Sequence, residues 1–389
     1  MRKRSARPLI DVVIPAYNAG KTIEASLRSI CDQTLSDIRL IVVNDGSTDD
    51  TGDILRRMAS EDDRIDVITT PNRGIVDALN TAFKHVDADI VARFDADDIA
   101  FPNRFEVQYA YLRDHPECAA VGCNVYFTND RNERTGDKSN FQFNVPNNPF
   151  HAPACEPYLL HPFLMVRRQA KAVAGPYRYA FHSEDADLYW RLGDAGLLIN
   201  LPDFLGEYRL HAGSVSGLSA LNGRVSAVNS QLAAVSEQRR RAGLPELRFE
   251  RETLAEYHEA QTLAGILDIA SRQLNAEEGA FLAIATSAKL LELSEYRPYR
   301  LTADDFATIR AMISKHHHLL TRPNRLRLLF RQVIMPKKTR MRAWNELSTL
   351  MPFHLYPRAS VELFAHAATK GSRKLGQLVG RQPPVSASR

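Results

Sequence analysis

The sequence contains few cysteines and no long run of apolar residues. Its 389 residues include four cysteines, which form no Cys-x-x-Cys pair and are too sparse for a disulfide framework. No apolar run reaches the roughly 18 residues that a membrane-spanning helix needs. The basic start Met1-Arg2-Lys3-Arg4 is not followed by the apolar core of a signal peptide. These absences predict a cytoplasmic protein with reduced thiols.

The charge is distributed unevenly along the chain. Residues 321–389 carry fourteen Lys and Arg but two Asp and Glu, a local charge of +12, so residues 1–320 carry −8 of the total of +4. The composition, 44% hydrophobic and 25% charged, is typical of a globular protein, and the length suits two domains or one domain with a large extension. An acidic body with a basic tail predicts a polyanionic neighbour for the tail, either a membrane surface or nucleic acid.

Strand and helix patterns alternate in the first half of the chain. Short β-branched runs predict strands at residues 10–14, 38–43, 65–68 and 90–94, and apolar residues at helical spacing lie between and after them. This order predicts an α/β fold with a mostly parallel central sheet and helices on both faces. In such sheets ligands bind beyond the carboxyl ends of the strands.

The residues that follow the four predicted strands are polar. They are Pro15-Ala16-Tyr17-Asn18, Asn44-Asp45-Gly46-Ser47, Pro71-Asn72-Arg73-Gly74 and Asp95-Ala96-Asp97-Asp98. Two carboxylates two residues apart repel each other unless a cation lies between them, and Mg²⁺ or Mn²⁺ prefers such oxygen ligands. Alternatively, Asp97 or Asp98 merely caps a helix that begins near Pro102. Four polar strand ends in one sheet are harder to attribute to chance than an isolated Asp-x-Asp.

These segments, in this order, resemble the motifs of family 2 glycosyltransferases, which have the A-type fold of nucleotide-diphospho-sugar transferases. Three later segments continue the resemblance: His161-Pro162, Ser183-Glu184-Asp185-Ala186-Asp187-Leu188 and Tyr208-Arg209-Leu210-His211. The resemblance covers about residues 8–215, which we expect to form the catalytic domain. It implies transfer of a sugar from a nucleotide-sugar donor.

The resemblance also implies a role for each residue of the donor site. Ala16 and Tyr17 would frame the nucleotide base, with Tyr17 stacking on it, and Asp45 would accept a hydrogen bond from the base, typically uracil. Arg73 would lie near the base or the diphosphate, and Asp95 would contact the ribose or a metal-bound water. From the residues alone, Tyr17 could instead pack at a strand end, Asp45 could form a turn, and Arg73 could be a solvated loop cation.

The metal and the catalytic base follow from the same resemblance. Asp97 would bind Mn²⁺ or Mg²⁺ across the donor phosphates, and His211 is a second candidate for the metal, although a loop histidine is often only solvated. Asp185 would be the general base that activates the acceptor hydroxyl, with Glu184 as its neighbour and substitute. Attack in line at the anomeric carbon would invert its configuration. Acidic residues there are also typical of a solvated helix N-terminus, which is compatible with catalysis. His161 would shape the acceptor side.

The rest of the chain shows helical patterns without the family motifs. We expect helices at about 220–242, 250–273, 277–293, 303–317, 325–334 and 358–380. Processive relatives have a Gln-x-x-Arg-Trp motif, which Gln238-Arg239-Arg240-Arg241 does not complete, so we expect single additions. Residues 216–380 would form a helical region with a basic tail, and 381–389 would be disordered.

Basic, apolar and aromatic residues interleave in the tail, as in an interfacial membrane anchor. Residues 321–389 could thus hold the enzyme at the cytoplasmic face of the inner membrane, or form an ordinary helix with a solvated basic face. We therefore predict an inverting transferase that moves a sugar, UDP-linked, to a glycan or lipid-linked acceptor in cell-surface polysaccharide synthesis, with no nucleic-acid partner. A nucleotidyltransferase would need a glycine-rich basic loop after the first strand, and a non-catalytic binding module would need no base.

Overall fold

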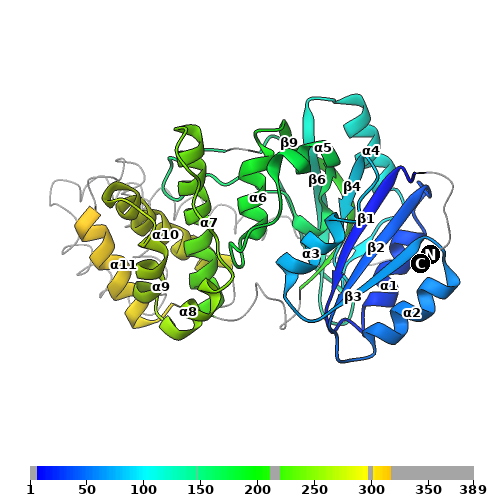
Figure 1. Ribbon diagram of the computed structural model, residues 1–389, viewed down its shortest axis with the longest axis horizontal. Coiled ribbons are helices and arrows are strands. Elements are labelled where there is room, and N and C mark those ends of the chain that lie inside the picture. Colours follow the sequence, from blue (N-terminus) through cyan, green and yellow to red (C-terminus); the bar gives the residue numbers. More distant parts are fainter. Residues whose placement is uncertain (1–6, 146, 211–219, 297–300, 317–389) are drawn as a thin grey trace, which may run out of the picture.

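The computed structural model describes residues 7–145, 147–210, 220–296 and 301–316. They form two lobes side by side, one built around a sheet and one of helices (Figure 1). The basic tail 321–389 lies outside these residues, and with it the predicted helices at 325–334 and 358–380 and the segment 381–389.

Nine strands of the described residues form one mixed sheet, in the order β3-β2-β1-β4-β8-β6-β9-β5, with β7 paired to β6. The strands are β1 Ile10–Ala16, β2 Ile38–Asp45, β3 Ile65–Thr70, β4 Ile90–Arg93, β5 Ile99–Ala100, β6 Cys118–Thr128, β7 Arg134–Lys138, β8 Met165–Arg167 and β9 Leu197–Arg209. The first four strands are parallel, as predicted. The sheet becomes mixed where β8 joins antiparallel to both β4 and β6.

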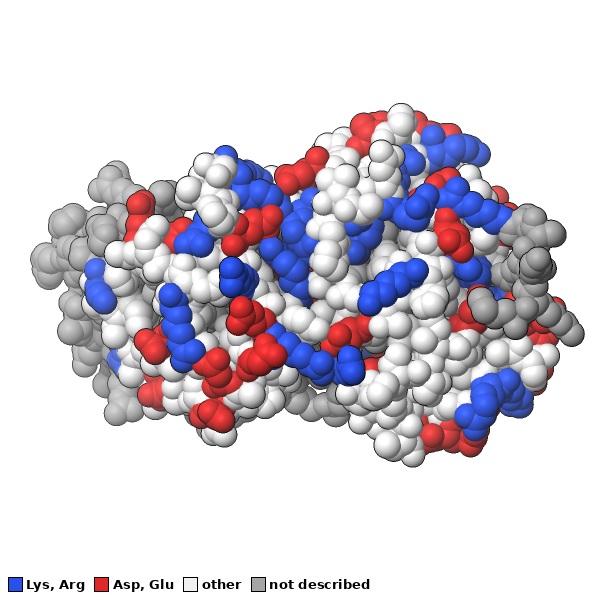
Figure 2. Space-filling model, viewed as in Figure 1, with Lys and Arg blue, Asp and Glu red and all other residues white. Residues whose placement is uncertain are grey.

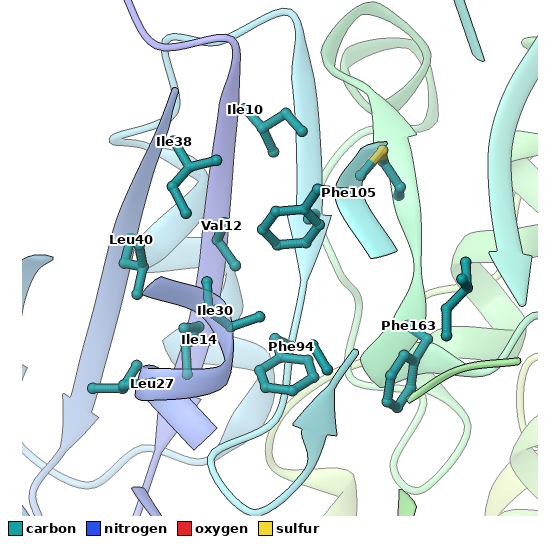
Figure 3. Packing of buried hydrophobic residues seen from close by; sticks show 14 of the residues in the cluster. Ile10, Val12, Ile14, Leu27, Ile30, Ile38, Leu40, Phe94, Phe105 and Phe163 are labelled. Atoms are coloured by element: carbon teal, nitrogen blue, oxygen red, sulfur yellow. The ribbon is translucent and has the colours of Figure 1, made fainter. Parts of the chain in front are cut away.

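Alternate residues of the strands pack on opposite faces of the sheet. Ile10, Val12 and Ile14 of β1 belong to the core on one face, together with Leu27 of α1, which lies near Ile14 (Figure 3). Val13 belongs to the core on the other face. The first face is covered by α1 Ile23–Cys31, α2 Thr51–Glu61 and α4 Arg104–Asp114, and the second by α3 Ile75–Phe83, α5 Arg168–Ala174 and α6 Glu184–Leu192. The prediction of helices on both faces is confirmed.

The helical lobe has its own apolar core. Its described helices are α7 Ala220–Arg241, α8 Thr253–Ala260, α9 Leu263–Ser271, α10 Ala276–Tyr296 and α11 Ala303–His316. The single helix predicted at 250–273 is wrong, because Gln261 has a left-handed backbone (φ 52°) that ends α8. The Thr262 side chain then accepts a hydrogen bond from the Gly265 amide and starts α9.

The two lobes meet at α6 and α7. Trp190 of α6 is buried in a small cluster with Ala233 and Ala234 of α7. An ion pair also crosses from the sheet lobe to the loop after α7, with Arg178 Nη1 2.6 Å from Glu246 Oε2. Elsewhere on the surface, Lys and Arg are interspersed with Asp and Glu over both lobes of the face in Figure 2. Among the described helices, none is both long and apolar enough to span a bilayer.

Candidate active site

The loops after β1 and β2 hold each other in place. Asn18 has a left-handed backbone (φ 49°), donates its amide to Ser47 Oγ (3.0 Å) and accepts the Thr48 amide on Oδ1 (2.8 Å). Ala16 is buried at the end of β1, and the next residue, Tyr17, is 52% exposed. The interlocked loops therefore place an aromatic side chain in the open at the carboxyl edge of the sheet.

Asp45, at the end of β2, organises the loop after β3. Its buried carboxylate accepts hydrogen bonds from the backbone amides of Arg73 (3.0 Å) and Gly74 (2.7 Å) and from Thr70 Oγ1 (3.2 Å). Gly74 has φ 89°, a backbone conformation that favours glycine. Arg73 itself is exposed. Asp45 thus does more than form a turn, and its two oxygens have lone pairs left for a further donor.

Three carboxylates gather after β4. Oxygen atoms of Asp95, Asp97 and Asp98 all lie within 4.8 Å of one another. Neither Asp97 nor Asp98 caps the next helix, because α4 begins only at Arg104. The alternative based on capping is therefore wrong.

Asp98 is the most buried of the three, with 1% of its surface exposed. Its Oδ1 accepts the backbone amide of Arg209 (2.9 Å), and its Oδ2 has no hydrogen-bond partner among the described residues. Burial, together with the charges of Asp95 and Asp97, raises the pKa of Asp98 well above its usual value. A buried carboxylate oxygen without a donor fits either a proton or a cation.

Arg209, at the end of β9, forms hydrogen bonds to the acidic loop, residues 95–98. Besides the bond to Asp98, its Nε donates to the Asp97 carbonyl (2.9 Å) and its Nη1 to the Asp130 carbonyl (3.2 Å). The end of β9 therefore fixes the backbone of the acidic loop. His211, the second metal candidate, lies outside the described residues.

Arg93, the last residue of β4, is a buried cation between the acidic groups. It is 2% exposed, and its Nη2 lies 2.6 Å from Asp95 Oδ1. Its Nε and Nη1 are buried without a hydrogen-bond partner in the part of the chain that the structure describes. Its positive charge acts to lower the pKa of both Glu184 and Asp185. Arg93 is therefore bonded to Asp95 and lies close enough to the acidic start of α6 for its charge to act there.

Glu184 and Asp185 begin α6, where we expected the base. Burial and the neighbouring Asp185 charge raise the pKa of Glu184 to about 7. Burial also raises the pKa of Asp185, although the carboxylate accepts the Ala186 amide (2.8 Å). Two carboxyl groups that resist ionisation are suited to take up a proton.

The third acid of α6 has a different environment. Asp187 is 1% exposed and forms ion pairs with Arg178 and, at 2.6 Å, with Nη2 of Arg191. The two guanidinium groups hold the pKa of Asp187 below its usual value despite burial. Asp187 is therefore a structural anchor of α6 rather than a candidate base.

His161 is buried, and its Nε2 lies 2.9 Å from the Tyr177 hydroxyl. Burial and the charge of Arg93 lower the pKa of His161 well below its usual value. The imidazole is therefore kept neutral, held by Tyr177 and not presented to solvent.

Arg93 was not predicted as a site residue, and Asp98 and Arg209 stand in the quoted motifs without an assigned role in the site. One signal was available, because Arg93 is a charged residue inside the otherwise apolar run Ile90-Val91-Ala92-Arg93-Phe94. A charge in a buried strand needs a partner. The bonds of Arg209 depend on β9 returning to the acidic loop, which local patterns do not reveal.

The comparisons with known proteins agree with this geometry. Residues 11–171 match the model of glycosyl transferase family 2. An uncharacterised glycosyltransferase of Haemophilus influenzae is 32% identical over 230 residues, which are 54% of this chain and 68% of that relative. The amylovoran biosynthesis glycosyltransferase AmsE of Erwinia amylovora is 30% identical over 211 residues, 52% of this chain and 76% of the relative. The chain belongs to glycosyl transferase family 2 and is a glycosyltransferase.

The fold is shared with a solved structure. Staphylococcus aureus TarS (residues 1–349), solved in complex with UDP-GlcNAc, superposes with a TM-score of 0.51 at 16% identity, covering 79% of this chain and 91% of the other. Its A-type glycosyltransferase fold confirms the predicted fold class. Family membership also excludes the two alternative functions considered from the sequence, a nucleotidyltransferase and a non-catalytic binding module.

Proposed function

We propose that the enzyme moves a sugar from a nucleotide donor, UDP-linked, to a hydroxyl of a glycan or lipid-linked acceptor, with inversion at the anomeric carbon. One observation carries the proposal: three carboxylates gather after β4, with the buried Arg93 paired to Asp95, and the charge of Arg93 also acts on the Glu184–Asp185 pair at the start of α6. The first group suits the diphosphate side of the reaction, and the second suits deprotonation of the acceptor.

The acidic cluster fits a divalent cation, Mn²⁺ or Mg²⁺. Both ions take oxygen ligands, and three carboxylates with oxygens within 4.8 Å offer them. The unpartnered Oδ2 of Asp98 supports the fit, because a cation would satisfy it. Asp97 and Asp98 would hold the ion, and Asp95, kept in position by Arg93, would contact it or the ribose. The ion would act as a Lewis acid on the leaving diphosphate.

The chain's own residues supply the remaining steps. Tyr17 and Asp45 would bind the base, with Arg73 on the same edge of the sheet. Asp185 would take the proton from the acceptor hydroxyl, whose oxygen forms the bond to the anomeric carbon. The bond from that carbon to the phosphate oxygen breaks at the same time, and the nucleoside diphosphate leaves with the electron pair. Glu184 would share the proton.

The setting of the reaction rests on the names of similar proteins. AmsE is named for amylovoran biosynthesis, and WbnJ of Escherichia coli, 29% identical over 80% of its length, for O-antigen biosynthesis. Both are polysaccharides, which supports a role in cell-surface polysaccharide synthesis for this chain. The incomplete Gln-x-x-Arg-Trp motif supports single additions.

The experiment is a donor-hydrolysis assay on the full chain. Nucleotide release is measured from UDP-, GDP- and dTDP-sugars with Mn²⁺, with Mg²⁺ and with EDTA. The proposal expects metal-dependent UDP release that Asp97→Asn abolishes. Preference for GDP- or dTDP-sugars would overturn the donor class, and equal rates in EDTA would overturn the metal.

We also propose that residues 8–215 form the catalytic domain and residues 216–380 a helical region whose basic part reaches a membrane. The +12 charge of residues 321–389 supports the second proposal. Flotation with anionic and neutral liposomes, with and without these residues, tests it. Equal recovery of both proteins would remove the membrane proposal and leave the enzymatic one intact.

A further inference from the structure

Tyr158 is an exposed aromatic residue within a buried segment. Between residues 151 and 166, all other side chains are buried or half-buried, whereas Tyr158 is 46% exposed. The following Leu159 and Leu160 both belong to the cores of the sheet lobe. Single exposed aromatics are ordinary on protein surfaces, so the meaning of this one depends on where it lies.

Its segment passes the active site. Burial raises the pKa of Tyr189, which lies one turn after Asp185 on α6, and the charges of Asp185 and Tyr158 are among the further causes. Burial also raises the pKa of Tyr208, with the aspartates after β4 and Tyr158 contributing. Two residues before Tyr158, Glu156 acts on the pKa of Asp185. Geometry places the segment there as well, because the ring of His161, three residues after Tyr158, packs edge-on against Tyr189, with centroids 6.3 Å apart and planes at 86°.

The ring is held by contacts that do not cover it. The Tyr158 carbonyl accepts a hydrogen bond from Asn200 Nδ2 (2.9 Å) of β9, which fixes the backbone. The Phe141 ring lies beside the phenol, with centroids 5.3 Å apart and planes at 55°. The side chain is therefore supported from one side and open to solvent on another.

We propose that Tyr158 is the platform on which a pyranose ring of the acceptor packs. The C–H face of a pyranose is apolar and fits an aromatic ring, while its hydroxyl groups point outward at the rim. A ring seated on Tyr158 can offer one of those hydroxyls to the Asp185 side of the site. This inference rests on the proposed function, since it names the acceptor side of the same site.

The test measures saturation transfer by NMR from the full chain, loaded with UDP and the diamagnetic Mg²⁺, to the methyl pyranosides of glucose, galactose, mannose and N-acetylglucosamine. We expect wild type to bind at least one of them through ring protons. Tyr158→Ala is expected to weaken that binding about tenfold, and Tyr158→Phe to retain it, because the ring and not the hydroxyl provides the platform.

Phe143→Ala is the matched control. Phe143 is equally exposed, at 46%, but packs edge-on against Tyr111 of α4, and its loss is expected to leave pyranoside binding unchanged. The platform is overturned if wild type binds none of the four pyranosides, if Tyr158→Ala binds like wild type, or if Phe143→Ala weakens binding equally. Metal-dependent UDP-sugar hydrolysis by wild type is measured in parallel. Its presence with a failed platform leaves the proposed function standing, and its absence counts against that function.

Discussion

Arg93 and Asp95 form an ion pair at the end of β4, with 2.6 Å between Nη2 and Oδ1 and the guanidinium almost fully buried. Replacing Arg93 by Met leaves several carboxylates without their buried cation. We expect a loss of about 2–3 kcal/mol in the free energy of unfolding and at least a hundredfold loss in kcat. Urea denaturation and donor hydrolysis measure the two effects. Arg93→Lys keeps the charge and is expected to recover stability more than activity, so equal recovery of both would argue against a positioning role.

Asp185 and Asp187 lie two residues apart, but we expect their replacement to have different effects, on activity for Asp185 and on stability for Asp187. Asp185→Asn removes the proposed base and is expected to lower kcat by 10²–10⁴, while the melting temperature stays within a few degrees of wild type, because burial already disfavours the charged form. Asp187→Asn leaves Arg178 and Arg191 without their partner and is expected to cost about 3 kcal/mol of stability. Transfer assays of both variants measure the effect on kcat, and urea titrations measure the effect on stability. A stable, active Asp185→Asn enzyme would remove Asp185 from the mechanism.

The raised pKa of Glu184 predicts a pH dependence of stability. The folded state holds a proton on Glu184 up to about pH 7, whereas the unfolded state releases it near 4.5, so more protons are bound in the folded state between these values. The contribution of Glu184 to the free energy of unfolding is therefore fully present below about pH 4.5 and decreases as the pH rises to 7. Glu184→Gln is expected to show a smaller decrease than wild type over this window in urea titrations. Parallel curves for the two proteins would contradict the shift.

Asp98 links stability to the metal. In Asp98→Asn an amide replaces the Oδ2 that has no partner, so the metal-free variant is expected to be about as stable as wild type. Mn²⁺ at about a hundred times its Kd stabilises a single-site protein by about 2.7 kcal/mol, and the variant is expected to lose most of that gain. Thermal shifts with Mn²⁺ and with EDTA measure it. A full shift in the variant would place the ion elsewhere.

Local patterns predicted the parallel half of the sheet well, because β1 to β4 are short apolar strands separated by amphipathic helices. The same order placed the ends of β1, β2 and β4 at one edge, and therefore located Tyr17, Asp45 and Asp97. The change from a parallel to a mixed sheet at β8 could not be predicted from the sequence, because β8 has only three residues, Met165–Arg167, which are too few to show an alternating pattern. The break at Gln261 was missed because a left-handed residue other than glycine leaves little trace in a helical pattern.

The site was predicted only as far as its consecutive motifs. Asp185 stands in a motif, but the roles of Arg93 and Tyr158 depend on neighbours that are distant in the chain: Asp185 is 92 positions from Arg93, and Asn200, which fixes Tyr158, is 42 positions from it. Buried polar atoms without partners, such as Nε of Arg93, become visible only when the fold closes around them.

The Trp190 cluster between α6 and α7 bears on how this enzyme can be engineered. Residues 8–215 mark the extent of the family motifs, but a protein cut at 215 would lose Ala233 and Ala234 and leave the indole of Trp190 uncovered, on the helix that begins with the proposed base. Arg251, which donates to the Arg73 carbonyl (3.4 Å), would be lost as well, and with it a support of the donor loop. Chimeras that exchange acceptor specificity between relatives should therefore carry α7 and the loop that follows it along with the sheet, and place the junction nearer to α8.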